Sequence, residues 1–267
     1  MSLRSTVRAL PTLLRIGFAE AVAYRAEMIV WVLATTMPLV MLGLWSAVAQ
    51  GAPIGRYGER QFVAYFLATF IVRQVTGSWA FWEMNMEVRS GALAMRLLRP
   101  VHPLSAYAAE SLASMPLRAL VSLPVAFLAL FLVGANDVAH GAVAWLLWVV
   151  SVAGAWLITL LVNFAVGAAA FFVESSVKLM DAWLVFFFVL SGYLIPVDLF
   201  SPTLRAIVDW LPFRYQIGLP VEIMTGAVSP SAALALLARQ WLWVLVSGTA
   251  AALLWRAGTR RFAAYGG

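Results

Sequence analysis

The side chains that could carry chemistry in this sequence are few, and their types exclude several kinds of site. The chain has no cysteine and only two histidines, His102 and His140, which lie far apart. Disulfides, thiolate metal sites, cysteine nucleophiles and histidine-rich metal sites are therefore excluded. The single lysine, Lys178, follows the residues ESSV, and no glycine-rich phosphate-binding loop precedes it. We expect no catalytic residue, no metal site and no cofactor bound by this chain.

Arg73 falls near the middle of an apolar segment, where an ionisable group is costly. Such a residue normally faces a partner or a cavity. Gln74 and Thr76 are the nearest candidate partners in sequence, and Glu83 and Glu87 follow further along. Arg73 is therefore either one member of a structural pair inside a helix bundle or part of the lining of a translocation path. The sequence leaves both alternatives open.

Several carboxylates gather on what the charge pattern predicts to be the inner side of a membrane. They are Glu83, Glu87, Glu110, Glu174 and Asp181. They could form a proton relay, but pairing with neighbouring arginines is the commoner arrangement and is the one we expect. Arg118, near the inner end of another apolar segment, is expected to extend its head group toward the interface.

The overall composition is that of a membrane protein. Hydrophobic residues make up 63% of the 267 positions and charged residues 11%, and the mean hydropathy is +0.90. A soluble domain carries about a quarter charged residues. The net charge of +6 then indicates cytoplasmic loops and contacts with membrane lipid, and no nucleic-acid partner is expected.

Six apolar segments approach or exceed the length of about 20 residues that crosses a bilayer. They cover roughly residues 27–48, 62–82, 111–133, 142–173, 182–197 and 233–255. With the N-terminus inside, eleven of the 18 Lys and Arg residues lie on the inner side and five on the outer side. The sequence thus predicts an all-α integral membrane protein with six transmembrane helices and both termini in the cytoplasm.

Small and kinking residues indicate how these segments pack. Gly154, Asn163 and Gly167 in the fourth segment favour close helix packing rather than a site. Three prolines are expected to kink their spans; they are Pro38, Pro116 and Pro124.

The N-terminal segment has three arginines, Arg4, Arg8 and Arg15, within about 40° of one another on a helical wheel. Pro11 is expected to interrupt one continuous helix there. The pattern indicates an interfacial helix on the inner leaflet that leads at an angle into the first span. The alternative is a basic tail that only sets the topology.

The connection RSGALAMRLLRPVHPLSAY, residues 89–107, contains helix punctuation. Ser90 can cap a helix, GALAMRLL favours helix except at Gly91, and Pro100 ends it. Two prolines then fix an extended path. The segment is either a short cytoplasmic helix that docks a partner or a basic loop that only obeys the positive-inside rule.

The connection after the fifth span, residues 198–232, is long and apolar. Within it, residues 201–211 predict a short helix with Ser201 as cap, Pro202 at the first position, and Leu204, Ile207, Val208 and Leu211 on one face. A soluble loop would not carry so much apolar surface, so this segment is expected to enter the membrane or lie on its outer face.

The strings YRAEMIVWVL, GALAMRLLRPVHPL and SGYLIPVDLFSPTLRAIVDWLPFRY, in this order around six spans, resemble the ABC-2-type exporter permeases. The resemblance is to the bacterial branch often encoded as two permeases beside one ATPase, and it covers nearly the whole chain. It implies a single transmembrane domain, 1–267. Within it, 1–25 is the interfacial connecting helix, 84–110 the cytoplasmic coupling region and 194–232 the outer re-entrant gate region.

The resemblance also implies roles for individual residues. Residues 90–98 become the coupling helix that enters a cleft of the ATPase. The implied ATPase-docking residues are Arg89, Ser90, Leu93, Arg96, Leu97, Arg99 and Pro100. The implied outer-gate residues are Tyr193, Pro196, Phe200, Pro212 and Phe213.

The expected function is the transmembrane permease subunit of an ATP-binding-cassette exporter in the bacterial inner membrane, moving an amphipathic or lipid-like substrate. Two copies of an ABC ATPase bind ATP and Mg²⁺, and a second permease, a sister chain rather than an identical copy, completes the assembly. Span one has no ladder of aromatic residues, which disfavours a polysaccharide substrate. The alternatives are a proton-coupled transporter using Arg73 and the inner carboxylates, and a membrane enzyme acting on lipid.

Overall fold

The computed structural model describes residues 3–133 and 138–262, and these form helices with no strand. The longer helices, of at least 13 residues, are α1 (Leu3–Ala23), α3 (Met37–Ala49), α4 (Glu59–Thr76), α7 (Pro103–Val133), α8 (Ala142–Ala168), α9 (Val177–Leu190) and α12 (Pro230–Thr259). The shorter helices are α2 (Arg25–Ala34), α5 (Ala80–Ser90), α6 (Leu93–Leu97), α10 (Pro202–Val208) and α11 (Gly218–Met224). Three short 3₁₀ helices lie between them: η2 (Ala169–Phe171), η3 (Val197–Leu199) and η4 (Arg214–Gln216).

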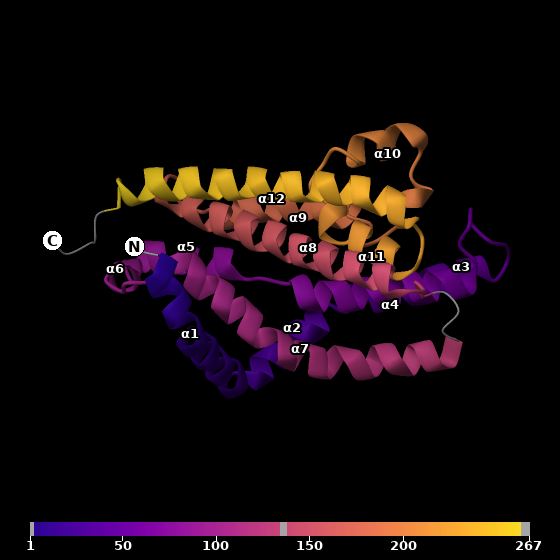
Figure 1. The fold of residues 1–267 in the computed structure, drawn as a ribbon, viewed down its shortest axis with the longest axis horizontal. Coiled ribbons are helices and arrows are strands. Elements are labelled where there is room, and N and C mark those ends of the chain that lie inside the picture. Colours follow the sequence, from indigo (N-terminus) through magenta and orange to yellow (C-terminus); the bar gives the residue numbers. More distant parts are fainter. Residues whose placement is uncertain (1–2, 134–137, 263–267) are drawn as a thin grey trace.

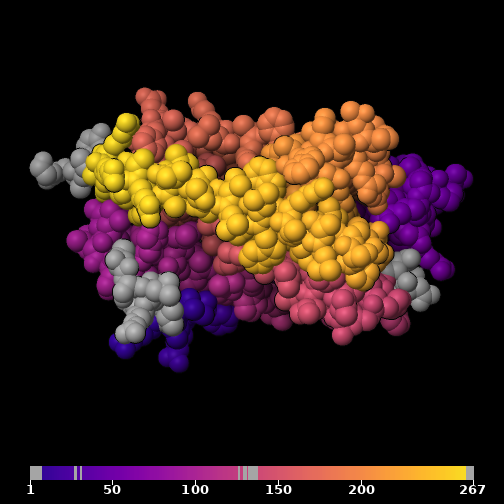
Figure 2. Space-filling model, turned by 45° about the horizontal axis from the view of Figure 1, so that its top comes forward, coloured from indigo at the N-terminus to yellow at the C-terminus, as the bar shows by residue number. Residues whose placement is uncertain are grey.

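The helices form an elongated bundle whose two ends differ. The start of α1, the α5–α6 region and the end of α12 lie at one end, which we call the α6 end (Figure 1). The end of α3 and the α10–α11 region lie at the opposite end, called the α10 end, and the space-filling view shows the same separation (Figure 2). The two ends thus correspond to the segments that the charge pattern places on opposite sides of a membrane.

Three segments of the described residues are long and apolar enough to cross a membrane, namely Val32–Ala49, Ala142–Phe171 and Pro230–Thr259. The chain is therefore an integral membrane protein with an all-α fold. The charged residues that interrupt the other helices, such as Arg73 in α4 and Arg118 in α7, lie at positions with specific contacts that are described below.

The first predicted span is two helices, α2 and α3, and not one. Pro38 has no backbone N–H and its ring would crowd the carbonyl of Ala34, which disfavours a helix through this point; Pro38 instead lies in the first turn of α3. The hydroxyls of Thr35 and Thr36 donate to carbonyls three residues earlier at 2.9 and 2.7 Å. The carbonyls of Val32 and Leu33 at the end of α2 thereby gain hydroxyl donors, and the helix breaks before Pro38 where only a kink was expected.

The second predicted span is likewise interrupted, between α4 and α5. The backbone of Gly77 is extended, with φ −63° and ψ 139°, and helix resumes only at Ala80. No proline explains this break. It is held instead by contacts from α7, which are the subject of the next subsection.

The prediction for Pro11 was wrong, because α1 is continuous from Leu3 to Ala23 with Pro11 inside it. The helix packs closely on α7: a Cβ atom on Gly17 would lie 3.0 Å from Ala113 and 3.2 Å from the backbone of Glu110. This packing stabilises α1 and offsets the backbone hydrogen bond that Pro11 cannot donate. Pro116 and Pro124 also lie inside a continuous helix, α7.

Close packing around α8 was predicted from its small residues and is confirmed. A Cβ atom on Gly154 would lie 2.8 Å from the side chain of Gln240 in α12, and one on Gly167 would lie 2.9 Å from Met84 in α5. Asn163 donates to the carbonyl of Thr159 within α8. Helices α5 and α12 therefore contact α8 through its small residues, and α8 forms the centre of the bundle.

Candidate functional site

The connection between α5 and α6 differs from the predicted helix 90–98. Helix α5 continues to Ser90, and Gly91 ends it with a left-handed backbone at φ 78°. Ser90 is therefore the last residue of α5 and not the cap of a new helix, although its Oγ accepts a 3.4 Å hydrogen bond from the N–H of Ala92. The helix that follows, α6, has only five residues.

The faces of α6 correct part of the predicted docking set. Leu93 is 0% exposed and packs in the core with Met84 and Tyr107, so its side chain cannot contact a partner. The strongly exposed side chains are instead Met95 at 68% and Leu98 at 78%. Sequence reasoning missed these two, because a five-residue helix is too short for its periodicity to define a face.

The other residues of the predicted docking set are mostly at the surface. Arg89, Ser90, Leu97, Arg99 and Pro100 are exposed. Together with Met95 and Leu98 they give the α6 end a surface that is apolar in the middle and basic at its edges. We call Met95, Leu97, Leu98 and Arg99 the α6 surface.

Arg96 points away from this surface and into the protein. Its guanidinium lies 2.7 Å from Glu83, 2.7 Å from Glu87 and 3.2 Å from Glu110. It also lies over the ring of Tyr107, with Cζ 4.4 Å from the ring centroid. Arg96 is thus an internal anchor that joins α6 to α5 and α7, and its predicted contact with the ATPase stays a prediction.

We call Arg96, Glu83, Glu87 and Glu110 the Arg96 cluster. It confirms the expected pairing with arginine for Glu83, Glu87 and Glu110, which share one guanidinium. Among the described residues, Glu174 and Asp181 form no ion pair, so the expectation does not hold for them. Burial, and then the proximity of Glu110, raise the pKa of Glu83 to about 7 despite the opposing effect of Arg96. Burial also raises the pKa of Glu110. The cluster therefore retains an excess of acidic groups.

Arg118 of α7 holds the interruption between α4 and α5. One of its guanidinium nitrogens, Nη1, donates to the carbonyls of Gln74 and Gly77 at 3.3 and 2.9 Å. The other, Nη2, donates to the carbonyl of Ser111 at 3.1 Å and to the hydroxyl of Ser114. A cation at the last carbonyls of a helix is favourable. The expected role as an interfacial anchor is wrong, because the guanidinium turns inward to these groups.

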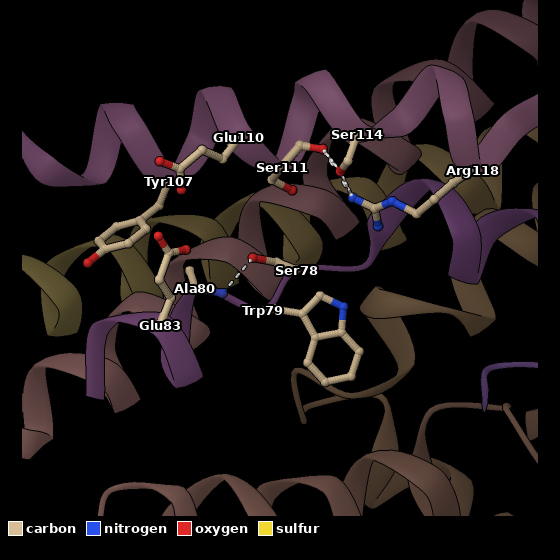
Figure 3. Close-up of a pocket in the computed structure, with 9 residues that line it drawn as sticks. All are labelled: Ser78, Trp79, Ala80, Glu83, Tyr107, Glu110, Ser111, Ser114 and Arg118. Atoms are coloured by element: carbon tan, nitrogen blue, oxygen red, sulfur yellow. Dashed lines mark hydrogen bonds between the residues drawn. The ribbon is translucent and has the colours of Figure 1, made fainter. Parts of the chain in front are cut away.

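A cavity of about 150 Å³ lies between the α4–α5 interruption and α7. It is lined by Ser78, Trp79, Ala80, Glu83, Tyr107, Glu110, Ser111, Ser114 and Arg118. Figure 3 shows Glu83 and Glu110 at one end, Arg118 at the other and serine side chains between them. We call this space the inner cavity. No predicted site included it, because it exists only where the second span is broken.

Arg73 contacts none of the partners that its sequence neighbours suggested. Its guanidinium lies close to the hydroxyl of Tyr193 and over the ring of Phe187, with Cζ 5.4 Å from the centroid. Its Nε atom is buried without a hydrogen-bond partner. Among the described residues, Arg73 forms no ion pair, so a relay that joins it to the inner carboxylates has no support in these contacts.

The candidate partners of Arg73 are engaged elsewhere. Gln74 donates to the hydroxyl of Thr35 at 2.9 Å, and Thr76 donates to the carbonyl of Val72. The hydroxyl of Tyr193 donates to the carbonyl of Thr35 at 3.4 Å. Thr35, which lies between α2 and α3, is therefore hydrogen-bonded both to α4 and to the segment after α9.

The predicted outer-gate residues lie mostly inside the protein. Tyr193, Pro196, Pro212 and Phe213 are buried and Phe200 is half-buried. Phe213 contacts Trp183 of α9, with ring centroids 4.7 Å apart. They form the packing between this segment and the bundle, and within the chain they line no described cavity.

The short helix predicted for residues 201–211 is present as α10. Ser201 caps it by accepting a 3.4 Å hydrogen bond from the N–H of Leu204, and Pro202 is its first residue. Val208 is buried, but Ile207 of the expected apolar face is 54% exposed.

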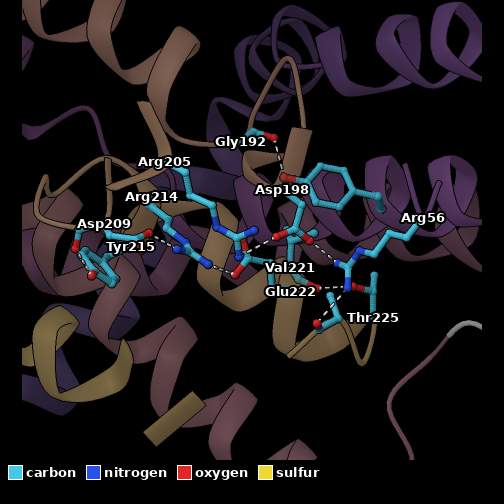
Figure 4. Close-up of polar contacts among 12 residues, drawn as sticks. Arg56, Gly192, Asp198, Arg205, Asp209, Arg214, Tyr215, Val221, Glu222 and Thr225 are labelled. Atoms are coloured by element: carbon cyan, nitrogen blue, oxygen red, sulfur yellow. Dashed lines mark hydrogen bonds and ion pairs between the residues drawn. The ribbon is translucent and has the colours of Figure 1, made fainter. Parts of the chain in front are cut away.

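Sequence reasoning missed a set of ion pairs at the α10 end. Asp198 pairs with Arg56 at 2.5 Å and with Arg205 at 2.8 Å. Arg214 pairs with Asp209 and, at 2.6 Å, with Glu222, and Arg214 and Glu222 are 2% and 1% exposed. Figure 4 shows these pairs joining the loop before α4 to η3, η4 and α11. The available signal was the balance of three acidic and three basic residues within otherwise apolar connections.

The N-terminal helix presents a mixed surface. Arg8 and Arg15 are exposed, and so are the apolar residues Ile16 and Phe18. The side chain of Arg4 lies outside the part that the structure describes. The interfacial placement of α1 stays a prediction, and it fits a helix that lies along α7 and exposes both residue types.

Comparison with known proteins was made by family and by individual relatives. A family model described as "ABC-2 family transporter protein" matches residues 29–266. A search of the curated proteins found no match. The matched region begins within α2 and includes the Arg96 cluster, the inner cavity and the ion pairs of the α10 end.

Proposed function

Because this chain belongs to the ABC-2 family of transporter proteins, we propose that it is the permease subunit of an exporter that a separate ATPase drives. Membership of the family and its apolar helices make the chain a multi-pass permease component of an ABC transporter. The proposal adds the bacterial inner membrane, six spans with both termini in the cytoplasm, and outward transport.

The α6 surface is the observation that carries this proposal. It exposes Met95 and Leu98 at the same end of the bundle as the start of α1 and the end of α12. Two apolar side chains at 68% and 78% exposure beside Arg99 form an apolar centre with a basic rim, as protein interfaces do. We assign this surface to contact with the ATPase. The ATPase would bind ATP and Mg²⁺ in its own site.

The Arg96 cluster explains how a contact at α6 could move the spans. Arg96 forms ion pairs with Glu83 and Glu87 of α5 and with Glu110 of α7. A force on α6 therefore reaches both helices. From α5 it passes the Gly77 interruption to α4, where Arg118 provides a second link to α7.

The outer part of the proposal concerns the segment between α9 and α12. Its ion pairs and the hydrogen bond from Trp45 to the Leu194 carbonyl, at 3.0 Å, tie it to α3 and to the loop before α4. A movement of α4 would thus reach this segment, which we propose forms the outer gate. Its gate residues act by shifting this packing rather than by lining an open pore.

The complete assembly in this proposal has two ATPase copies and a second permease, with a sister chain favoured over an identical one. The substrate path lies between the permeases. An amphipathic or lipid-like substrate fits a path lined mainly by apolar side chains. Arg73, buried without a carboxylate, either lines that path or holds the α2–α3 break through Tyr193.

Co-purification tests the proposed docking. The variant Met95→Asp/Leu98→Asp places two charges on the α6 surface and leaves Leu93 and Arg96 in place. We expect it to insert normally and to lose about tenfold or more of the ATPase encoded beside the permease gene, because buried interface charges without partners cost several kcal/mol. Ile207→Asp on exposed α10 is the matched control. Equal recovery of the ATPase with both variants would contradict the proposal.

A further inference from the structure

The inner cavity separates opposite charges across a short distance. Its cationic end is Arg118, whose guanidinium hydrogen-bonds to carbonyls and a hydroxyl but forms no ion pair among the described residues. Carbonyls satisfy the N–H groups without neutralising the charge. Its acidic end is Glu83 and Glu110, which share a single guanidinium with Glu87. The cavity thus has one unneutralised cation and an excess of carboxylates.

The distance between the two ends fits a small group. Arg118 lies eight residues after Glu110 in α7, which is about 12 Å along a helix. Its side chain runs back toward the start of α7, as helix side chains do, and reaches the carbonyl of Ser111 at 3.1 Å. The guanidinium is therefore about one helical turn from Glu110, and not the full 12 Å.

Three serines, Ser78, Ser111 and Ser114, lie in the wall between the charged ends, and the first residue of α5, Ala80, lies beside Ser78. Ser111 and Ser114 already donate to the carbonyls of Gly77 and Ser111, so the hydroxyl of Ser78 is the donor available to an anion. The start of α5 adds a partial positive charge at the same place. A cavity of about 150 Å³ has room for a small polar head group and not for a whole lipid.

We propose that the inner cavity binds a phosphate ester that carries an ammonium group, as in the head group of phosphatidylethanolamine. The phosphate lies toward Arg118 and Ser78, and the ammonium lies between Glu83 and Glu110. A lipid of the inner leaflet enters with its ammonium toward the α6 end and its acyl chains toward the bundle centre. Three carboxylates share the single guanidinium of Arg96, which favours an added cation beside them.

This inference rests on the proposed function only for placing the α6 end at the inner leaflet, and it needs no ATPase. The test is therefore native mass spectrometry of the purified full-length chain, titrated with lipids of equal acyl chains. We expect phosphatidylethanolamine to bind about tenfold more tightly than phosphatidylglycerol, which lacks the ammonium. Free phosphoethanolamine is added as a competitor. If free phosphoethanolamine displaces the lipid at a similar concentration, the ligand of the cavity is a soluble phosphate ester. If much higher concentrations are needed, the ligand is the lipid.

Variants locate the binding site. In the double variant Glu83→Gln/Glu110→Gln, phosphatidylethanolamine and phosphatidylglycerol should bind with about equal affinity. Glu59→Gln, at the opposite end of the bundle, should leave the preference for phosphatidylethanolamine unchanged. Arg118→Gln should weaken both lipids, and Ser78→Ala tests the same end if Arg118→Gln does not fold. Equal binding of the two lipids by the unaltered chain, or an unchanged preference in the double variant, would overturn the inference. Loss of ATPase co-purification alone would bear only on the docking proposal.

Discussion

The guanidinium of Arg96 lies 2.7 Å from the carboxylate of Glu87, and this pair joins α6, the shortest α-helix among the described residues, to α5. The same guanidinium contacts Glu110 of α7 at 3.2 Å. Five residues of α6 could not hold a fixed position by their own hydrogen bonds, because short helices are marginal. The internal ion pairs provide that position, and they leave the opposite side of α6 free to contact another protein.

Removal of the Arg96 anchor should loosen α6 without changing its surface. Arg96→Ala leaves three carboxylates without their cation, and we expect a loss of about 1–3 kcal/mol, below the full cost for a buried pair because Glu83 is partly exposed. Limited proteolysis within residues 89–102 should accelerate, and the melting temperature should fall. Arg99→Ala, at the exposed neighbour, is the control. Equal protease resistance of the two variants would show that Arg96 does not hold α6.

The contact between Gly77 and Arg118 predicts the effect of a single added methyl group. A Cβ atom at Gly77 would lie 2.8 Å from Nη1 of Arg118. Gly77→Ala should therefore displace the guanidinium and lower stability by about 1–3 kcal/mol, through the carbonyls that lose a donor. The backbone there suits any residue, so the cause is steric.

The matched control is Gly43→Ala within α3, where a Cβ would meet nothing within 4 Å. It should be neutral or stabilise the chain by up to about 1 kcal/mol. Chemical or thermal unfolding in detergent measures both variants. If Gly77→Ala is as stable as Gly43→Ala, Arg118 does not hold the α4–α5 interruption.

Arg73 can be assigned to structure or transport by comparing two readouts. A buried cation without a carboxylate is seldom a net source of stability, so an apolar residue of similar volume should be tolerated. We expect Arg73→Met to melt at or above the temperature of the unaltered chain, and Arg73→Ala and Arg73→Met to lower transport about tenfold or more. Arg60→Met, at an exposed position of α4, is the control. Loss of assembly with no separate effect on transport would favour the structural pair with Tyr193.

The buried pair at the α10 end should behave differently from the exposed one. Arg214→Met leaves the Glu222 carboxylate unpaired at 1% exposure, and should cost about 3–5 kcal/mol. The double variant Arg214→Met/Glu222→Gln should recover much of this loss. Arg205→Ala, which removes a 41% exposed partner of Asp198, should cost no more than about 1 kcal/mol. A double-mutant cycle with coupling below about 0.5 kcal/mol would contradict the pairing.

The sequence predicts the helices much better than it predicts the positions of their breaks. Three of the six predicted spans correspond to segments long and apolar enough to cross a membrane, Val32–Ala49, Ala142–Phe171 and Pro230–Thr259. Gly154 and Gly167 correctly indicated the close packing of α8. The break at Gly77 depends on Arg118, which lies 41 positions later. No local pattern could show a helix end that is stabilised from another helix.

The candidate site shows the same division. The 89–107 segment was recognised as distinctive from its arginines and prolines, but its inward and outward residues were partly interchanged. Leu93 and Arg96 are held by core and ion-pair contacts, whereas Met95 and Leu98 are free of them. A variant with Asp at Leu93 would disrupt the core and would not test docking, which is why the proposed test uses Met95 and Leu98.

Cross-linking at one position tests the central claim most directly. The chain has no cysteine, so Leu98→Cys introduces a unique thiol on the α6 surface, and Trp210→Cys does the same at an exposed position just after α10. A short bifunctional thiol reagent is applied to membranes that contain the permease and the ATPase encoded beside it. We predict a permease–ATPase product with Leu98→Cys and none with Trp210→Cys. Absence of that product at Leu98, or equal yield at both positions, would contradict the assignment of α6 as the site that contacts the ATPase.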